Sequence, residues 1–134
     1  MTITRINPSE LHGTPGYHHV TIVEPRRLAF IAGQCPLDRS GALVGQDDVE
    51  AQVDQVAANA ATALAAVGAL PEHVVRTVIY VVGDDRAVLA AVWRRFGESR
   101  IAGGFTTAST LVGVTRLGFP GQLVELDLTA ALPG

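Results

Sequence analysis

Residues 122–129, near the end of the chain, constrain the fold more than any other segment. Apolar and acidic residues alternate in this segment: Val124, Leu126 and Leu128 are apolar, and Glu125 and Asp127, which lie between them, are acidic. Because successive side chains on a strand point to opposite faces, this alternation predicts a strand with one core face and one face that carries two carboxylates. Carboxylates are mostly solvated, so the pair is either the wet face of an antiparallel strand or the first candidate for chemistry.

The composition limits the possible classes of function. A chain of 134 residues fits a single domain, residues 1–134, with a sizeable core. Aromatic residues make up only 5% of the chain, so a cleft has few rings on which bases could stack. The net charge is −3, whereas nucleic-acid binding depends on clustered Lys and Arg. We therefore expect no nucleic-acid partner.

The single cysteine and the hydropathy bear on location and on metals. Cys35 cannot form an internal disulfide and gives no pair of thiolate ligands, which suits a reducing cytoplasm. No apolar run approaches the roughly 20 residues of a membrane span, and the N-terminus lacks a signal pattern. We expect a soluble cytoplasmic protein with no membrane partner, no metal and no cofactor.

Two amphipathic helices are predicted in the middle of the chain. Each has an apolar stripe at helical spacing between an acidic N-cap and a glycine stop. The caps and stops are Asp47 with Glu50 and then Gly68 for the first helix, and Asp84 or Asp85 and then Gly97 for the second. Trp93 belongs to the second stripe, so a core position is favoured over contact with a ligand.

Six strands are predicted around these helices, at residues 3–6, 17–23, 27–32, 74–82, 107–114 and 121–132. The second and third are joined at residues 24–26 as a hairpin or meander, and the fourth is expected to be buried on both faces. The order βββαβαββ predicts an α+β two-layer domain, one six-stranded mixed sheet with both helices on one face. Its uncovered face, which carries Glu125, is expected to be closed by identical subunits.

A series of short motifs, in order along nearly the whole chain, resembles the RidA (YjgF-type) family of reactive-intermediate deaminases. They are Tyr17 after Pro-Gly, residues 31–38 (IAGQCPLD), Gln52, the Gly68-Ala69 stop, Val78 with Tyr80, and residues 123–127 (LVELD). The resemblance implies a chorismate-mutase-like fold and a homotrimer whose sheets form an inner barrel with clefts between subunits. It also implies hydrolysis of small enamines or imines such as 2-aminoacrylate, with release of ammonia.

The family's cleft residues carry over only in part. The deaminases have Pro-x-Arg-Ser where residues 106–109 read Thr-Thr-Ala-Ser, so the Arg that holds the substrate carboxylate falls on Ala108. The cleft Ser falls on Ala32, a helix Asn near Leu89, and a frequent Cys on Thr110. A guanidinium–carboxylate pair is bidentate and charge-assisted, which an alanine cannot replace. Arg100 and Arg116 lie in nearby loops and are the candidates to take over this role.

The matching positions that remain predict a mechanism. Imine hydrolysis needs a positioned water, a group that moves protons, and donors for the developing charge. We expect Glu125 and Tyr17 to be catalytic, with a main-chain N–H near Gly33 or Ser109 holding an oxygen. The predicted substrate-binding positions are Ala32, Gly33, Gln34, Leu89, Ala108, Ser109 and Thr110. With the family Arg absent, a neutral or larger, more apolar ligand is expected.

Three further side chains, those of His18, His19 and Cys35, have no assigned role in this mechanism. Strand alternation would let at most one of His18 and His19 join Tyr17 in the cleft. A metal site on the two adjacent histidines is not favoured, because neighbours on a strand point apart. Cys35 is expected to serve as a small apolar residue rather than as a nucleophile.

Three classes of function stay open. The first is a deaminase acting on an enamine or imine, inefficient on 2-aminoacrylate; the second is a non-catalytic trimer that binds a small ligand. The third is a ribonuclease, a label attached to some relatives, which the acidic balance and scarce aromatics make the least favoured. Turnover, as opposed to thermal stabilisation alone, separates the first two.

Overall fold

The computed structural model describes residues 1–24 and 27–134, and its elements follow the predicted order. They are β1 (Ile3–Ile6), β2 (Val20–Val23), β3 (Arg27–Gln34), α1 (Val49–Ala66), the short 3-10 helix η1 (Pro71–His73), β4 (Val74–Val82), α2 (Arg86–Gly97), the 3-10 helix η2 (Ala102–Phe105), β5 (Ala108–Val114) and β6 (Val124–Leu132). The α+β class is confirmed. The predicted turn at residues 24–26 falls largely on Pro25 and Arg26, which lie outside the described residues.

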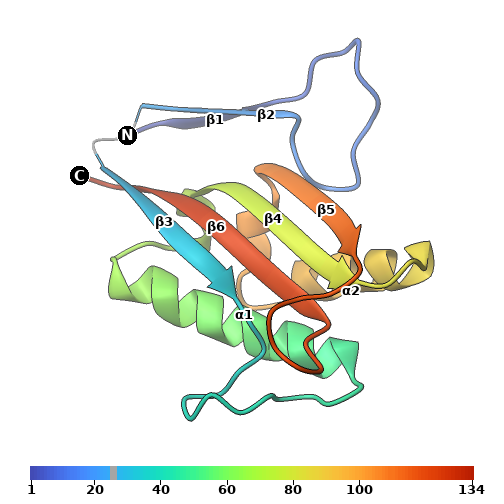
Figure 1. Cartoon of the computed structure of the whole chain (residues 1–134). Coiled ribbons are helices and arrows are strands. Elements are labelled where there is room, and N and C mark those ends of the chain that lie inside the picture. Colours follow the sequence, from blue (N-terminus) through green and yellow to red (C-terminus); the bar gives the residue numbers. More distant parts are fainter. Residues whose placement is uncertain (25–26) are drawn as a thin grey trace.

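The main sheet has four strands in the order β3-β6-β4-β5. β6 pairs antiparallel with both β3 and β4, whereas β5 runs parallel to β4. Parallel neighbours need a crossover connection, and α2 lies within this one. Figure 1 shows both helices on the same side of the sheet. The order makes β3 and β5 the two edges and β6 an inner strand, not the hairpin partner of β5.

The single six-stranded sheet expected from the sequence is divided in two. β1 and β2 form a separate antiparallel pair, and Figure 1 shows them apart from the main sheet, on the side away from α1. Individual contacts join the two parts. The Arg5 guanidinium donates to the carbonyls of Glu72 and Val74, and the Ala108 N–H donates to Thr21 Oγ1 at 2.9 Å. The hairpin is therefore held to the sheet by side chains rather than by a backbone ladder.

The core lies between the sheet and the two helices, as the alternation in β6 predicts. Val124, Leu126 and Leu128 are at most 2% exposed. They belong to one cluster with the helix stripes, which include Val53, Val56, Ala60 and Leu64 of α1 and Val92 and Phe96 of α2. The expected burial of both faces of β4 is wrong within one chain: Ile79 is buried, but Arg76 is exposed and Val78 is half-buried. Within residues 1–24 and 27–134, both α-helices lie on the other side of the sheet from that face (Figure 1).

The ends of several elements differ from the sequence-based expectations by a few residues. Asp48, not Asp47, caps α1 by accepting from the Ala51 N–H at 3.1 Å. Asp47 itself has φ = 58°, a left-handed conformation that precedes the helix. Asp85 caps α2. The second strand begins at Val20 rather than at residue 17, and the last at Val124 rather than at residue 121.

Gln52, one of the residues that carry the family resemblance, is fully buried at the start of α1. Its side-chain amide donates to the carbonyls of Gly45 and Gly121, both at 3.0 Å, and its oxygen accepts from the Leu123 N–H at 2.7 Å. Buried backbone groups need such partners. One side chain therefore ties the loop before α1 and the loop before β6 to the helix. Among the described residues, no helix is long and apolar enough to cross a membrane.

We predict that Gln52→Ala lowers the free energy of unfolding by about 3 kcal/mol, because it leaves three partly buried backbone groups without their partner and removes a fully buried side chain. Thr62→Ala is the matched control: Thr62 is exposed on the same helix and bonds only to Ala58 O, so its effect should stay within about 0.5 kcal/mol. Denaturant unfolding at fixed protein concentration measures both. Equal midpoints for the two variants would show that Gln52 does not tie the loops.

Candidate functional site

Glu125 is held on the face of the sheet opposite the helices. Its Oε1 accepts from Gln122 Nε2 at 3.1 Å, and the Cys35 Sγ lies 3.4 Å from the same oxygen. Gln122 is only 3% exposed and is itself fixed, because it also donates to Val124 O and accepts from the Phe119 N–H, each at 3.1 Å. Gln122 and Cys35 thus occupy one carboxylate oxygen and orient the other.

Gly33 makes room for that second oxygen. A Cβ built on Gly33 would lie 2.1 Å from Glu125 Oε2, so the carboxylate rests directly against the backbone of β3. The register between β3 and β6 shifts here, between Ile31 and Gln34, which is the mark of a bulge that re-aims side chains. Ala32 is exposed next to it. The glycine is therefore needed for the position of the carboxylate.

The two carboxylates of β6 have different partners. Asp127 Oδ2 accepts a hydrogen bond from the Tyr80 hydroxyl at 3.0 Å. This bond is the main cause that raises the pKa of Tyr80 above its ordinary value. Asp127 is therefore paired with a neighbouring strand, whereas Glu125 keeps one oxygen without a donor among the described residues.

A hollow of about 470 Å³ lies beside α2, and three of the predicted site residues line it. Its lining is Pro15, Tyr17, Arg86, Leu89, Ala90, Trp93, Ser109 and Leu111. On α2, positions 86, 89, 90 and 93 follow the spacing that places side chains on one helix face. Trp93 was expected in the core, but it is half-buried and lines this hollow while its indole donates to Pro15 O at 3.1 Å.

The polar groups of the hollow differ in how much they can offer a ligand. The Ser109 hydroxyl accepts from Thr77 Oγ1 at 2.6 Å and can donate to Thr107 O at 3.1 Å. The Tyr17 hydroxyl has no hydrogen-bond partner in the described part of the chain; the ring of Tyr17 is instead placed by edge contacts with Trp93 and His19. Tyr17 is thus the free donor of the two.

The arginines proposed from the sequence line other hollows. Arg100 lines one beside α1 together with Gln34, and Arg116 lines one formed by residues 115–123 and Val82. Arg86, which the sequence analysis did not single out, is the arginine that lines the Tyr17 hollow. Its distance of seven residues from Trp93 was the available signal, because two residues seven apart share a helix face.

The two adjacent histidines do not follow strand alternation, because residues 17–19 precede β2. The His19 ring makes edge contacts with Tyr17 and His12, at centroid distances of 5.8 and 4.7 Å. His18 Nδ1 contacts the carbonyl of Thr106. Among residues 1–24 and 27–134, no three His, Cys, Asp or Glu side chains are grouped so that they could hold a metal ion.

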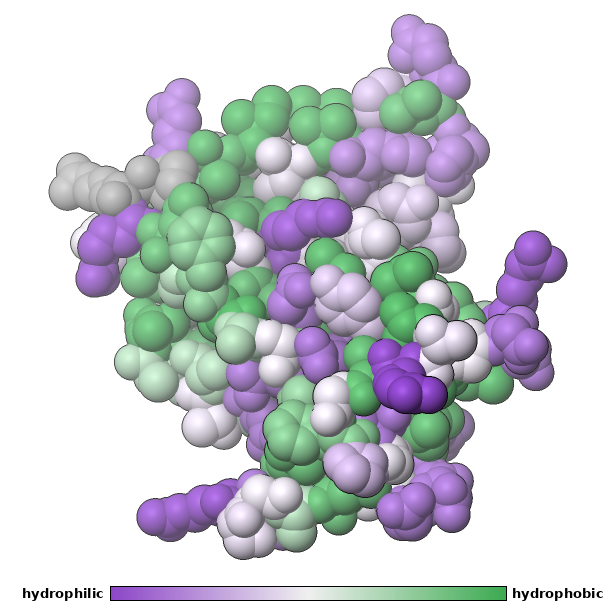
Figure 2. All heavy atoms as spheres, in the orientation of Figure 1, coloured by the Kyte–Doolittle hydropathy of each residue, from purple (hydrophilic) through white to green (hydrophobic). Residues whose placement is uncertain are grey.

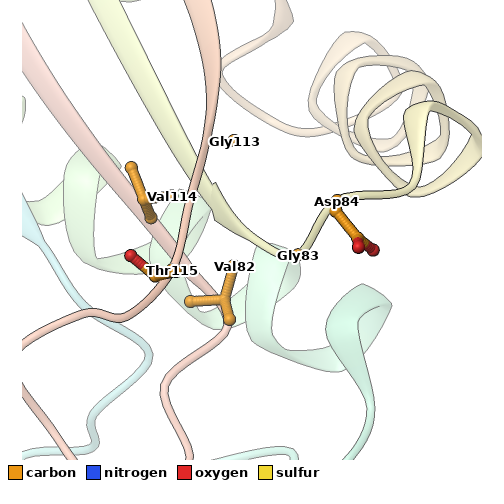
Figure 3. A pocket seen from close by; sticks show the side chains of 6 residues that line it. All are labelled: Val82, Gly83, Asp84, Gly113, Val114 and Thr115. Carbon is orange, nitrogen blue, oxygen red and sulfur yellow. The ribbon is translucent and has the colours of Figure 1, made fainter.

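A further hollow of about 570 Å³ lies at the carboxyl ends of the parallel strands β4 and β5, and Figure 3 shows its lining. It is formed by Val82, Gly83, Asp84, Gly113, Val114 and Thr115. Its polar side chains, Asp84 and Thr115, lie on different sides of it in Figure 3. None of the predicted site residues lines it, so we do not place the chemistry there.

Comparison with known proteins decides the family. The family described as "Endoribonuclease L-PSP" matches residues 9–132. The chain belongs to this family.

Relatives within this L-PSP family support the same assignment. Protein DfrA of Myxococcus xanthus is 34% identical over 114 residues, which cover 85% of this chain and 83% of DfrA. The RutC family protein slr0709 of Synechocystis is 33% identical over 106 residues, 78% of each chain.

Solved structures of Rid and YjgF proteins have the same fold. The Rid family protein YyfB of Yersinia pestis superposes with a TM-score of 0.90 at 36% identity and covers 98% of this chain and 100% of its own. Rv2704 of Mycobacterium tuberculosis, a member of the YjgF family, gives 0.63 at 28% identity, with 98% and 100% covered.

In this L-PSP family chain the predicted site residues fall into separate groups. Tyr17, Leu89 and Ser109 line the hollow beside α2. Glu125, Gly33 and Ala32 lie on the opposite face of the sheet, near the β3 edge. Ala108 and Thr110 flank Ser109 on β5 and so point away from it, and Gln34 lines the hollow beside α1. One chain does not bring Glu125 and Tyr17 together.

The Cys35–Glu125 contact has a measurable consequence. Burial, then the hydrogen bond to Glu125 and its negative charge, raises the pKa of Cys35 to about 11. Since the thiolate is the reactive form, alkylation of Cys35 by iodoacetamide should be slow at about pH 8.5. Glu125→Gln removes the negative charge and so lowers the pKa, and alkylation at that pH should become several-fold faster.

Asp127→Asn is the control for this measurement, because it removes a carboxylate of the same strand that bonds to Tyr80 and not to Cys35. Mass spectrometry of the alkylated chain gives the rates. Equal rates in the wild type and in Glu125→Gln would contradict the contact.

Proposed function

We propose that the protein is a RidA-like hydrolase of small enamines or imines, acting in a cleft shared between subunits of a cytoplasmic homotrimer. The family assignment supports the class of reaction. The observation that carries the proposal is the Glu125 carboxylate, with one oxygen held by Gln122 and Cys35 and the other directed over Gly33. A fixed carboxylate with one available oxygen suits a group that accepts a proton from water.

The reaction follows from these groups. Glu125 Oε2 accepts a proton from a water molecule as the water oxygen attacks the carbon of the C=N bond. The carboxyl passes this proton to the nitrogen, which gives a carbinolamine. Glu125 then moves the hydroxyl proton of the carbinolamine to the nitrogen, the C=O bond forms as the C–N bond breaks, and a carbonyl compound and ammonia leave. An enamine first gains a proton at carbon and loses one from nitrogen, which converts it to the imine. The Tyr17 hydroxyl donates a hydrogen bond that positions the substrate for this attack.

The positions of the two groups on the sheet support a shared cleft. Glu125 is on β6, two strands from the β5 edge that borders Tyr17, and strands are about 4.8 Å apart. The groups also lie on opposite faces. A second copy that packs near the β5 edge can supply its own Glu125, which the same chain cannot.

The surface near β3 supports assembly as well. Phe30 is 79% exposed, and Leu28 on the same face of β3 and Val20 and Ile22 of β2 are also exposed. Figure 2 shows apolar surface gathered at the upper left, where Figure 1 places β3 and the hairpin. Apolar side chains gathered on one part of a surface are typical of an interaction site, and symmetric homo-oligomers are the common way to close one.

The hollow favours apolar substrates over 2-aminoacrylate. Leu89 stands near where the resemblance puts an Asn, and Leu111, Trp93 and Pro15 add apolar lining. A branched or aromatic substrate side chain would bury apolar surface there, which stabilises binding by about 25 cal/mol per Å². The three-carbon 2-aminoacrylate offers little such surface.

The same apolar lining favours one alternative, a trimer that binds a small ligand without turning it over. The Ser109 hydroxyl is already engaged with Thr77 and Thr107, so Tyr17 and the cleft carboxylate would have to supply the chemistry. Release of ammonia distinguishes the two functions.

We predict that Glu125→Gln lowers ammonia release at least about 100-fold, because it removes the proton acceptor. The assay supplies imines made in place from leucine or phenylalanine by an amino acid oxidase, and ammonia release is compared with spontaneous hydrolysis. Light scattering should give three chain masses for the wild type and the variant alike. Asp127→Asn is the control on the same strand face and should keep most activity.

Wild-type turnover in Glu125→Gln would make the catalytic role of this residue wrong. Stabilisation by ligands without any wild-type turnover would favour the non-catalytic alternative, and a monomer at micromolar concentration would remove the shared cleft.

A further inference from the structure

We propose that Arg86 binds the carboxylate of the ligand at the hollow beside α2, and that this ligand is a small carboxylic acid with a branched or aromatic apolar side chain. The choice of imino acids among such ligands rests on the proposed hydrolase function. The carboxylate site itself rests on the geometry of α2 and β5.

The position of Arg86 is set by the helix. It is the first residue of α2, and Leu89, Ala90 and Trp93 follow at three, four and seven residues. These positions share one helix face, and all four line the same hollow. An exposed guanidinium thus borders a hollow whose other lining residues are mostly apolar.

No group in the described part of the chain neutralises the positive charge of Arg86. Its guanidinium has no ion pair or hydrogen bond there, whereas that of Arg95, on the same helix, binds Asp54 at 2.7 and 2.9 Å. The neighbouring Asp85 carboxylate is used as the N-cap, accepting from the Ala87 N–H. An arginine in a first helical turn is also unfavourable for the helix dipole. Helix stability therefore does not explain why an arginine stands at the first position of α2.

A second free donor lies in the same hollow. The Tyr17 hydroxyl has no hydrogen-bond partner among the described residues, and the Tyr17 ring is held by Trp93 at a centroid distance of 6.1 Å. A carboxylate accepts several hydrogen bonds and pairs well with the planar guanidinium fork. Two donors without partners among the described residues, beside a lining that is otherwise mostly apolar, match an acid with a charged head and an apolar side chain.

The side chain of the ligand is limited by the lining. Leu89, Trp93 and Leu111 offer apolar and aromatic surface, and the hollow measures about 470 Å³. Cavities of this size hold small molecules that bury most of their surface. Ser109, with its hydroxyl engaged by Thr77, adds little polar specificity. A linear polar acid would leave this apolar surface unused.

The test is a comparison of two stable probes, 3-phenylpropanoate and its neutral counterpart 3-phenylpropanamide, by isothermal titration calorimetry on the intact protein. The wild type should bind the carboxylate about tenfold more tightly than the amide, and this preference should shrink at high salt. Arg86→Gln should remove the preference and leave amide binding unchanged. Arg94→Gln is the matched control, since Arg94 is exposed on α2 and does not line the hollow, and it should keep the preference.

Equal binding of both probes by the wild type, an unchanged preference in Arg86→Gln, or an equal loss in Arg94→Gln would overturn the proposal. Binding and turnover separate this inference from the proposed function. A preference that depends on Arg86 without ammonia release would support the carboxylate site and contradict the hydrolase. Imine turnover with no Arg86-dependent preference would support the hydrolase function and contradict the carboxylate site.

Discussion

The burial of one face of β6 is the constraint on which the rest of the structure depends. Val124, Leu126 and Leu128 are packed between the sheet and both helices, and their loss from water is the main source of stability available to a chain with few aromatics. Because a strand alternates, this packing leaves no choice for Glu125: it must lie on the other face. There Gln122, Cys35 and the bare backbone of Gly33 fix its carboxylate.

The same sheet separates the groups that the chemistry needs. α2 and residues 15–17 form an apolar hollow at the β5 edge, with Tyr17 and Arg86 as its free donors. The carboxylate is on the opposite face, toward β3. Among the described residues, Glu125 does not line this hollow, and no carboxylate does. Assembly of identical copies joins them in our account, and this gives a physical reason for a family member to depend on its oligomer.

Much of the fold could be predicted because its signals are local. The alternation in residues 122–129 and the two helix stripes depend on backbone periodicity, and each lies within one element. The division of the sheet could not be predicted, because β1 and β2 alternate as main-sheet strands would, and only contacts between distant residues, such as the Ala108 N–H with Thr21 Oγ1, show how the pair is attached. The position of Asp47 in a left-handed turn likewise gave a start of α1 that was wrong by one residue.

The site was harder to predict than the fold. The roles of Glu125 and Tyr17 stay predictions, and their separation within one chain depends on strand order, which no local pattern reports. Gln122 was read as an ordinary residue of the last strand, yet it lies before that strand and bonds to Glu125. Arg86 was overlooked because the two loop arginines are nearer in sequence to Ala108. In each case the deciding contact joins elements that are distant in sequence.

Subunit mixing between Tyr17→Phe and Glu125→Gln chains tests the central claim most directly. Each variant alone should be nearly inactive in imine hydrolysis, because every site lacks one of the two groups. If each site takes Tyr17 from one chain and Glu125 from another, random assembly of equal amounts restores about a quarter of wild-type activity. Half of the chains carry an intact Tyr17 and half an intact Glu125, so about one site in four has both groups. Mixed oligomers no more active than their separate components would contradict a cleft shared between subunits.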